Sequence, residues 1–93
     1  MYINGSDEFI KVAKFYVSQM MKENLDPSDN VKFTMDDIYV VSHSFILGNQ
    51  KALISTTLPD GKYYEVTYNS EKDEMYVDCY VRLKQNVVKF NKE

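Results

Sequence analysis

The two side chains best suited to nucleophilic catalysis are Cys79 and His43, and each residue type occurs once in the chain. A thiol attacks a substrate efficiently when a base such as imidazole lies within hydrogen-bond reach of it. Both residues fall in stretches that alternate like β-strands, and the alternation places them on opposite faces of a sheet. We therefore expect no catalytic pair. Cys79 is predicted to be a small buried side chain and His43 a partly exposed sheet residue.

Paired carboxylates offer a second kind of chemistry, general acid–base catalysis. Glu65 and Asp78 fall on the same face of two neighbouring predicted strands, where they can lie directly opposite one another. Lys51 and Arg82 are predicted on that face as well, and opposite charges across strands form ion pairs. The pattern therefore favours a surface ion-pair ladder over an acid–base site.

Metal and phosphate sites find little support in the sequence. Residues 26–37 space oxygen atoms like a calcium-binding loop, but Val31 stands where that loop requires Gly, and Asp37 where it requires Glu. One Cys and one His are too few for a zinc site. The three Gly residues are isolated from one another, so no phosphate-binding loop is present. We expect no catalytic residues, no metal and no cofactor, and a protein that is not an enzyme.

The first element that must position these side chains is a helix, predicted over residues 6–24. Ser6 is a favourable N-cap, and Pro27 disfavours helical geometry at the residue before it. Apolar residues recur at spacings of three and four, which is typical of a helix with one buried stripe. The stripe consists of Phe9, Ala13, Tyr16, Val17, Met20, Met21 and Leu25.

Four strands follow the predicted helix, at about 37–47, 50–58, 62–69 and 74–84. These stretches are rich in β-branched and aromatic residues, and turn-forming residues separate them, most clearly Pro59-Asp60-Gly61. Three short connections in succession predict an antiparallel meander. We therefore expect a single domain over 1–93, an α+β fold in two layers with the helix packed on the sheet, and a C-terminal tail at 85–93.

Alternation within the strands predicts an aromatic outer face, on the side away from the helix. A typical solvated sheet face is polar, whereas this one carries aromatic and aliphatic side chains, and such patches mark interaction sites. Three occupants remain open: the C-terminal segment with Val87, Val88 and Phe90, a second copy of the chain, and a foreign protein. The candidate partner-binding residues are Tyr39, Val41, His43, Phe45, Tyr63, Tyr76, Tyr80 and Arg82.

Composition excludes several broad classes. The 93 residues carry a formal charge of −3 with no basic stripe, so nucleic-acid binding is not expected. A hydrophobic content of 44% at this small charge argues against disorder. No apolar run reaches the length of a membrane span, so no membrane association is expected. The lone Cys79, and residues 1–5 without a basic and apolar leader, lead us to expect a cytoplasmic protein.

Five segments together resemble a family of small phage and prophage proteins of low-GC Gram-positive bacteria whose function is unknown. The resemblance implies phage origin, action in the cytoplasm of a bacterial host, and an accessory role such as binding and inhibiting a host enzyme or defence component. It carries over no catalytic residue. The matching segments are Asp7–Ile10, Asp36–Val41, Lys51–Gly61, Tyr63–Asn69 and Glu74–Asp78.

The sequence thus favours a non-enzymatic protein that binds a protein partner through the aromatic sheet face. The first alternative is a homodimeric structural or assembly protein. The second is a small-molecule-binding module with a groove between helix and sheet.

Overall fold

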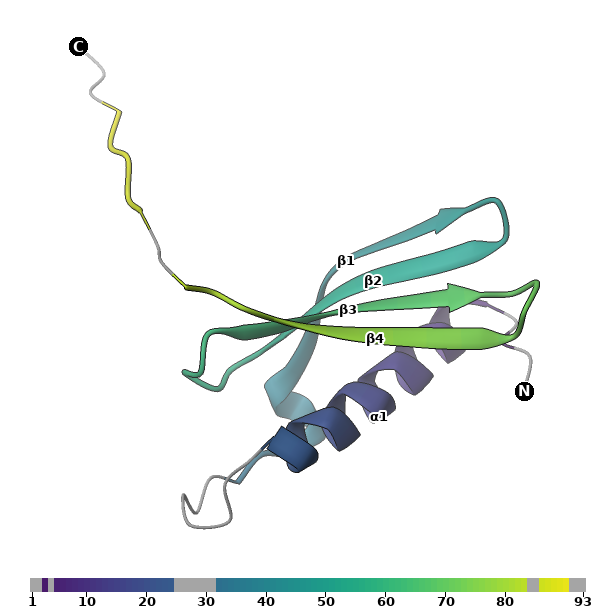
Figure 1. The fold of residues 1–93 in the computed structure, drawn as a ribbon, viewed down its shortest axis with the longest axis horizontal. Helices are drawn as coiled ribbons and strands as arrows, with labels where there is room; N and C mark the ends of the chain where they lie inside the picture. Colours follow the sequence, from purple (N-terminus) through teal and green to yellow (C-terminus); the bar gives the residue numbers. More distant parts are fainter. Residues whose placement is uncertain (1–2, 4, 25–31, 84–85, 91–93) are drawn as a thin grey trace.

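The chain folds into one helix laid across a four-stranded sheet (Figure 1). The computed structural model describes residues 3, 5–24, 32–83 and 86–90. The strands are antiparallel and follow the order β1-β2-β3-β4, so the predicted α+β meander is confirmed. The elements of the described part are α1 (Ser6–Asn24), η2 (Met35–Asp37), β1 (Ile38–Ile46), β2 (Asn49–Thr56), β3 (Lys62–Asn69) and β4 (Glu74–Val81).

Helix α1 buries one stripe against the sheet. Phe9, Ala13, Val17 and Met21 are all buried, and their spacing of four residues keeps them on one side of the helix. Tyr16 is 45% exposed although it belongs to the predicted stripe. The acidic first turn suits the positive end of the helix dipole. The core lies where this stripe meets the inner side chains of β1, β2 and β3.

Two tight turns set the register of the meander. Leu47 and Gly48 connect β1 to β2 with φ of 51° and 81°, the left-handed pair that matches the twist of a two-residue hairpin. Gly61 connects β2 to β3 with φ of 70°, a conformation that glycine adopts without strain. The backbone N–H of Arg82 donates to the Gly61 carbonyl over 2.8 Å, which joins this turn to the end of β4.

A β-bulge in β1 corrects the predicted faces of that strand. The pairing with β2 shifts between Val40 and Ser42, so Val41 is the extra residue. One extra residue reverses the side on which every later side chain lies. His43 is therefore opposite Ala52 and Phe45 opposite Gln50, on the face toward the helix. The prediction that His43 and Phe45 lie on the outer face is wrong for this reason.

The helix covers only part of the sheet. It runs obliquely beneath the strands and packs against β1, β2 and β3 (Figure 1). On the helix side of β4, Val77 is half-buried while Cys79 is exposed and Val81 is 52% exposed. The prediction of a buried Cys79 is therefore wrong. Alternation predicts the correct face for Cys79, but none of the described elements covers that end of β4.

The C-terminal segment does not cover the outer face. Strand β4 ends at Val81, and residues 86–90 extend away from the body of the domain (Figure 1). Val87, Val88 and Phe90 are 73%, 71% and 84% exposed. The first of the three predicted occupants of the aromatic face, the chain's own C-terminal segment, therefore does not occupy it in this structure.

Candidate functional site

Three tyrosines form a continuous row across the outer face of the sheet. The register places Tyr39 opposite Ser55, Ser55 opposite Tyr63, and Tyr63 opposite Tyr80, so one row crosses all four strands. The rings of Tyr63 and Tyr80 stack at a centroid distance of 5.3 Å. Tyr39, Tyr63 and Tyr80 remain 46%, 36% and 41% exposed. We call Tyr39, Tyr63 and Tyr80 the tyrosine row.

A charged row lies beside the tyrosine row. Glu65 is directly opposite Asp78, as predicted, and like charges in that position repel. Lys51 offsets part of this repulsion, because its Nζ atom lies 3.3 Å from Glu65 Oε1. Both members of the ion pair are partly exposed, so its contribution to stability is small. The predicted ion-pair ladder is thus present for Lys51 and Glu65.

Acidic neighbours raise the pKa of two tyrosines on the outer face, Tyr76 and Tyr80. The carboxylate of Glu65 raises the pKa of Tyr80 above its ordinary value, and burial and Asp78 act in the same direction. The Tyr76 hydroxyl donates to Glu74 Oε2, and this hydrogen bond raises the pKa of Tyr76. The outer face therefore carries two phenols of raised pKa beside acidic side chains.

A shallow hollow adjoins the end of the tyrosine row. It has a volume of about 340 Å³ and lies between Tyr39, Tyr63, Arg82 and the β2–β3 turn. The backbone hydrogen bond from the Arg82 N–H to the Gly61 carbonyl holds the start of the C-terminal segment beside this turn. An aromatic row with a cation and a recess at one end can accept the side chains of another protein.

The predicted partner-binding residues therefore divide into two groups. Tyr39, Tyr63, Tyr76 and Tyr80 lie on the outer face, and Arg82 lies at the end of the tyrosine row. Val41 is the bulged residue and is 56% exposed. His43 and Phe45 lie on the other face, so they do not belong to this surface.

His43 joins the helix to the sheet instead. Its ring stacks on Phe9 at a centroid distance of 5.4 Å, and its Nε2 atom lies 3.0 Å from Gln50 Oε1. The side-chain amide of the buried Gln50 in turn donates to the Gly5 carbonyl. These contacts link His43 to Phe9 and to Gln50 next to the first turn of α1, which gives His43 a structural role.

His43 and Cys79 do not meet, although the reason differs from the predicted one. They lie on the same face of the sheet but on opposite edge strands, β1 and β4. Three strand spacings separate them, or about 14 Å. A thiol and an imidazole at that distance cannot exchange a proton directly.

No cluster of three His, Cys, Asp or Glu side chains within residues 5–24, 32–83 and 86–90 could hold a metal ion. The calcium-loop spacing at 26–37 falls partly on residues 26–31, which lie outside the described residues. Asp37 has a structural role within it. Its carboxylate accepts the Thr34 N–H at 2.8 Å and the Thr57 hydroxyl at 2.7 Å, and these bonds lower the pKa of Asp37.

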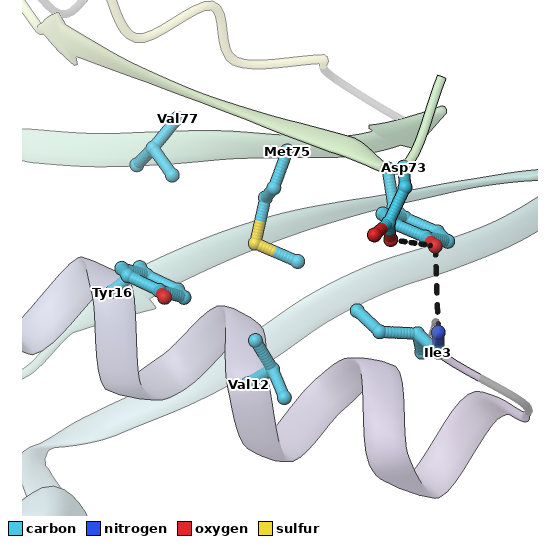
Figure 2. A pocket seen from close by; sticks show the side chains of 7 residues that line it. Ile3, Val12, Tyr16, Asp73, Met75 and Val77 are labelled. Atoms are coloured by element: carbon cyan, nitrogen blue, oxygen red, sulfur yellow. Dashed lines mark hydrogen bonds between the residues drawn. The ribbon is translucent and has the colours of Figure 1, made fainter. Parts of the chain in front are cut away.

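A second hollow, of about 310 Å³, opens between α1 and β4 (Figure 2). Val12 and Tyr16 line it from the helix, and Met75 and Val77 line it from β4. At one end the Tyr68 hydroxyl donates to Asp73 over 2.6 Å and accepts the N–H of Ile3. A groove between helix and sheet was predicted from the sequence, but without a set of lining residues. The half-exposed position of Tyr16 follows from the angle of α1, which periodicity does not specify.

Comparison with known proteins identifies the family of the chain. Residues 10–90 match the model of DUF6275, a family of unknown function, and the chain belongs to this family. No curated protein and no solved structure matches the chain. Among the described residues, no helix is both long enough and apolar enough to cross a membrane. Family membership assigns no activity, so the surfaces themselves must carry the functional argument.

Proposed function

We propose that this chain is a non-enzymatic protein-binding module, which contacts a protein partner through the outer face of its sheet. In the form suggested by its resemblance to phage proteins, it is a phage-encoded accessory factor or an inhibitor of a host or defence protein in the bacterial cytoplasm. The observation that carries the proposal is the tyrosine row, which spans all four strands and has no covering layer among the described residues.

The row has the physical properties of an interface centre. Tyr is enriched in such centres, because a rigid ring buries a large area at low cost in conformational entropy. The stack of Tyr63 on Tyr80 restricts both rings before any partner arrives. The flanking Glu65 and Asp78 form a polar border, which is also usual around an interface centre.

The border specifies the chemistry of the partner. The Tyr76 hydroxyl already donates to Glu74, whereas the Tyr80 phenol can donate to a partner or accept from it. Lys51 pairs with Glu65, and Asp78 lies directly opposite Glu65 in the sheet. A partner with a Lys or Arg near its contact residues would therefore complement this face.

The small-molecule alternative has its best location in the hollow between α1 and β4. A volume of about 310 Å³ is at the lower limit of ligand pockets. Tyr68 and Asp73, two polar residues of its lining, already hydrogen-bond to each other. The hollow therefore offers apolar area and few directional contacts, and we favour the protein-binding role.

The test compares two double variants as baits in the lysate of the cell that produces the protein. The first variant, Tyr39→Ala/Tyr80→Ala, removes both ends of the tyrosine row. The matched control, Phe15→Ala/Phe45→Ala, removes two aromatic rings that are also exposed, 50% and 63%, but lie on α1 and on the helix side of β1. Circular dichroism verifies that each variant is folded.

We expect the wild type and the control to enrich the same protein, and the tyrosine-row variant to lose it. Retention of every partner by a folded tyrosine-row variant would place binding elsewhere. Equal loss in both variants would show that nonspecific aromatic exposure, and not this face, drives capture.

A further inference from the structure

The two edge strands of the sheet differ in how well they are protected against pairing with another strand. Strand β1 contains the bulge at Val41, and a bulge twists an edge away from an incoming strand. Strand β4 pairs with β3 in an unbroken register from Glu74 to Val81, and within this range it contains no bulge, proline or lysine. A regular edge of this kind readily accepts a further strand. Of the two edges, β4 is therefore the one suited to pairing.

The backbone of β4 directs alternate residues toward this edge. The Arg82 N–H donates to the Gly61 carbonyl, so the even-numbered residues of the strand direct their hydrogen-bonding groups toward β3. The odd-numbered residues from Met75 to Val81 direct theirs away from β3, where the described residues contain no further strand. Their side chains lie on the helix side, because Cys79 is opposite the buried Tyr64.

The odd-numbered side chains from Met75 to Leu83 form an apolar strip that becomes more exposed along the chain. Met75 and Val77 are half-buried beside the hollow of about 310 Å³ between α1 and β4 (Figure 2). Farther along, Val81 is 52% exposed and Leu83 is 95% exposed. One end of the strip thus borders an apolar recess, and the other end offers apolar side chains that could fill it. The strip is complementary to a reversed copy of itself.

We propose that two copies of this chain form a homodimer by antiparallel pairing of their β4 strands, which joins the two four-stranded sheets into one sheet of eight strands. A two-fold axis perpendicular to the sheet produces this pairing, and each copy contributes the same edge. Opposite residues of an antiparallel pair lie on the same face, so the axis must pass through a residue and not between two residues.

The axis passes through Cys79, because this register matches the whole apolar strip. It places Val77 opposite Val81 of the second copy and Met75 opposite Leu83 of the second copy. The exposed end of each strip then lies beside the α1–β4 hollow of the other copy, where the lining is largely apolar.

Neighbouring registers are less favourable. An axis at Asp78 would set two carboxylates directly opposite one another, and like charges in that position repel. An axis at Val77 or at Tyr80 would shift the two strands along each other and leave one end of the apolar strip without an apolar partner. With the axis at Cys79, Asp78 lies opposite Tyr80 of the second copy, so no carboxylate of β4 directly faces another.

The size of the interface sets the expected affinity. Only residues 75–83 of each copy take part, whereas a standard interface involves about 20–30 residues a side. The backbone hydrogen bonds between the two strands supply specificity of register, but the buried area is small, and we expect a Kd on the order of 10 µM. The pairing uses the edge and the helix side of β4, so the tyrosine row stays uncovered and the dimer does not depend on the proposed function.

Sedimentation equilibrium of the reduced full-length chain, from about 5 to about 500 µM, tests the dimer. The mean mass should rise with concentration from 10.9 kDa toward about 22 kDa, the mass of two chains. Val81→Lys introduces the charge that natural edge strands use against pairing and should weaken dimerisation at least about tenfold. The matched control Ile46→Lys alters an aliphatic residue that is 64% exposed on the other edge strand, β1, and should keep the wild-type Kd.

Circular dichroism verifies that both variants are folded. A wild type that stays monomeric at about 500 µM overturns the proposal. Equal Kd values for Val81→Lys and the wild type would also overturn it, because the dimer would then form through another surface.

Oxidation of Cys79 by copper phenanthroline in air tests the register without any substitution. With the axis at Cys79, the two Cα atoms of this residue lie about 5.5 Å apart, within the range that a disulfide spans. We expect a covalent dimer whose rate of formation follows the fraction of noncovalent dimer, and which forms at least about tenfold more slowly in Val81→Lys. If the wild type and Val81→Lys cross-link at the same rate, the thiols meet only by random collision and the proposed pairing is refuted.

Discussion

Phe9 and Phe15 lie in the same helix, yet the structure predicts that replacing each by Ala lowers the free energy of unfolding by very different amounts. Phe9 is fully buried, with 0% exposure, and stacks on His43, whereas Phe15 is 50% exposed and touches the ring of Tyr16 edge-on. The same substitution, Phe→Ala, therefore removes a core side chain in one case and a surface side chain in the other. The comparison tests which side of α1 faces the sheet.

The expected magnitudes follow from burial. Phe9→Ala leaves a cavity in the core and should cost about 4 kcal/mol. For Phe15→Ala, the loss of a half-buried ring is partly offset by the better helix propensity of Ala, which leaves about 1 kcal/mol or less. A 93-residue domain has about 5 to 14 kcal/mol of stability in total, so the first variant would keep about 1 to 10 kcal/mol.

Urea denaturation followed by circular dichroism measures both variants. With a slope of about 1.5 kcal/mol per M, Phe9→Ala should lower the urea midpoint by about 2.5 M, and Phe15→Ala by less than about 0.7 M. Equal effects of the two substitutions, or a cost below about 1 kcal/mol for Phe9→Ala, would show that the helix presents a different side to the sheet. The packing described for α1, and with it the location of His43, would then be incorrect.

Three further predictions concern single positions. The exposed Cys79 thiol should react with Ellman's reagent in dilute native protein almost as fast as in urea, and slow native reaction would contradict its exposure. Hydrogen bonds from Thr34 and Thr57 lower the pKa of Asp37. The ionised carboxylate therefore stabilises the fold above the usual Asp pKa of about 4, and this stabilisation is lost as the pH falls through the lowered native pKa. Asp37→Asn should therefore lower the Tm at pH 7 and converge with the wild type near about pH 2.5, whereas an equal gap at both values would refute the role of the charge. Leu47 has φ of 51° in the β1–β2 turn, so Leu47→Asn should raise the Tm by about 4 to 8 °C, and an unchanged or lower Tm would contradict that backbone geometry.

The elements and their order could be predicted from local patterns in the sequence. The helix stripe with a spacing of three and four and the turn at Pro59-Asp60-Gly61 both specify their elements within a few residues. In β2, β3 and β4 the alternation assigns each side chain to the correct face, because no bulge interrupts those strands. The outer positions of Tyr63, Tyr76 and Tyr80 follow from this.

The faces of β1 could not be predicted in full, because a bulge has no reliable signature in one sequence. Both faces of β1 are apolar, so neither the position of Val41 nor the reversal at His43 was visible in the pattern. His43 therefore belongs to the helix–sheet contact with Phe9 and Gln50.

The exposure of Cys79 was unpredictable for a different reason. Alternation tells on which face a side chain lies, but not whether another element covers that face. The angle at which α1 crosses the sheet decides that Val77 is half-buried while Cys79 is exposed. The same angle produces the hollow between α1 and β4.

The tyrosine row is proposed above all to bind a protein. Its most direct test is the ratio of Kd values for the first captured partner, measured by calorimetry with Tyr39→Ala/Tyr80→Ala and with the control Phe15→Ala/Phe45→Ala. Loss of interface-centre tyrosines typically costs at least about 2 kcal/mol, so the tyrosine-row variant should bind at least about 30-fold more weakly than the control. Folded variants whose Kd values agree within about threefold would contradict the claim.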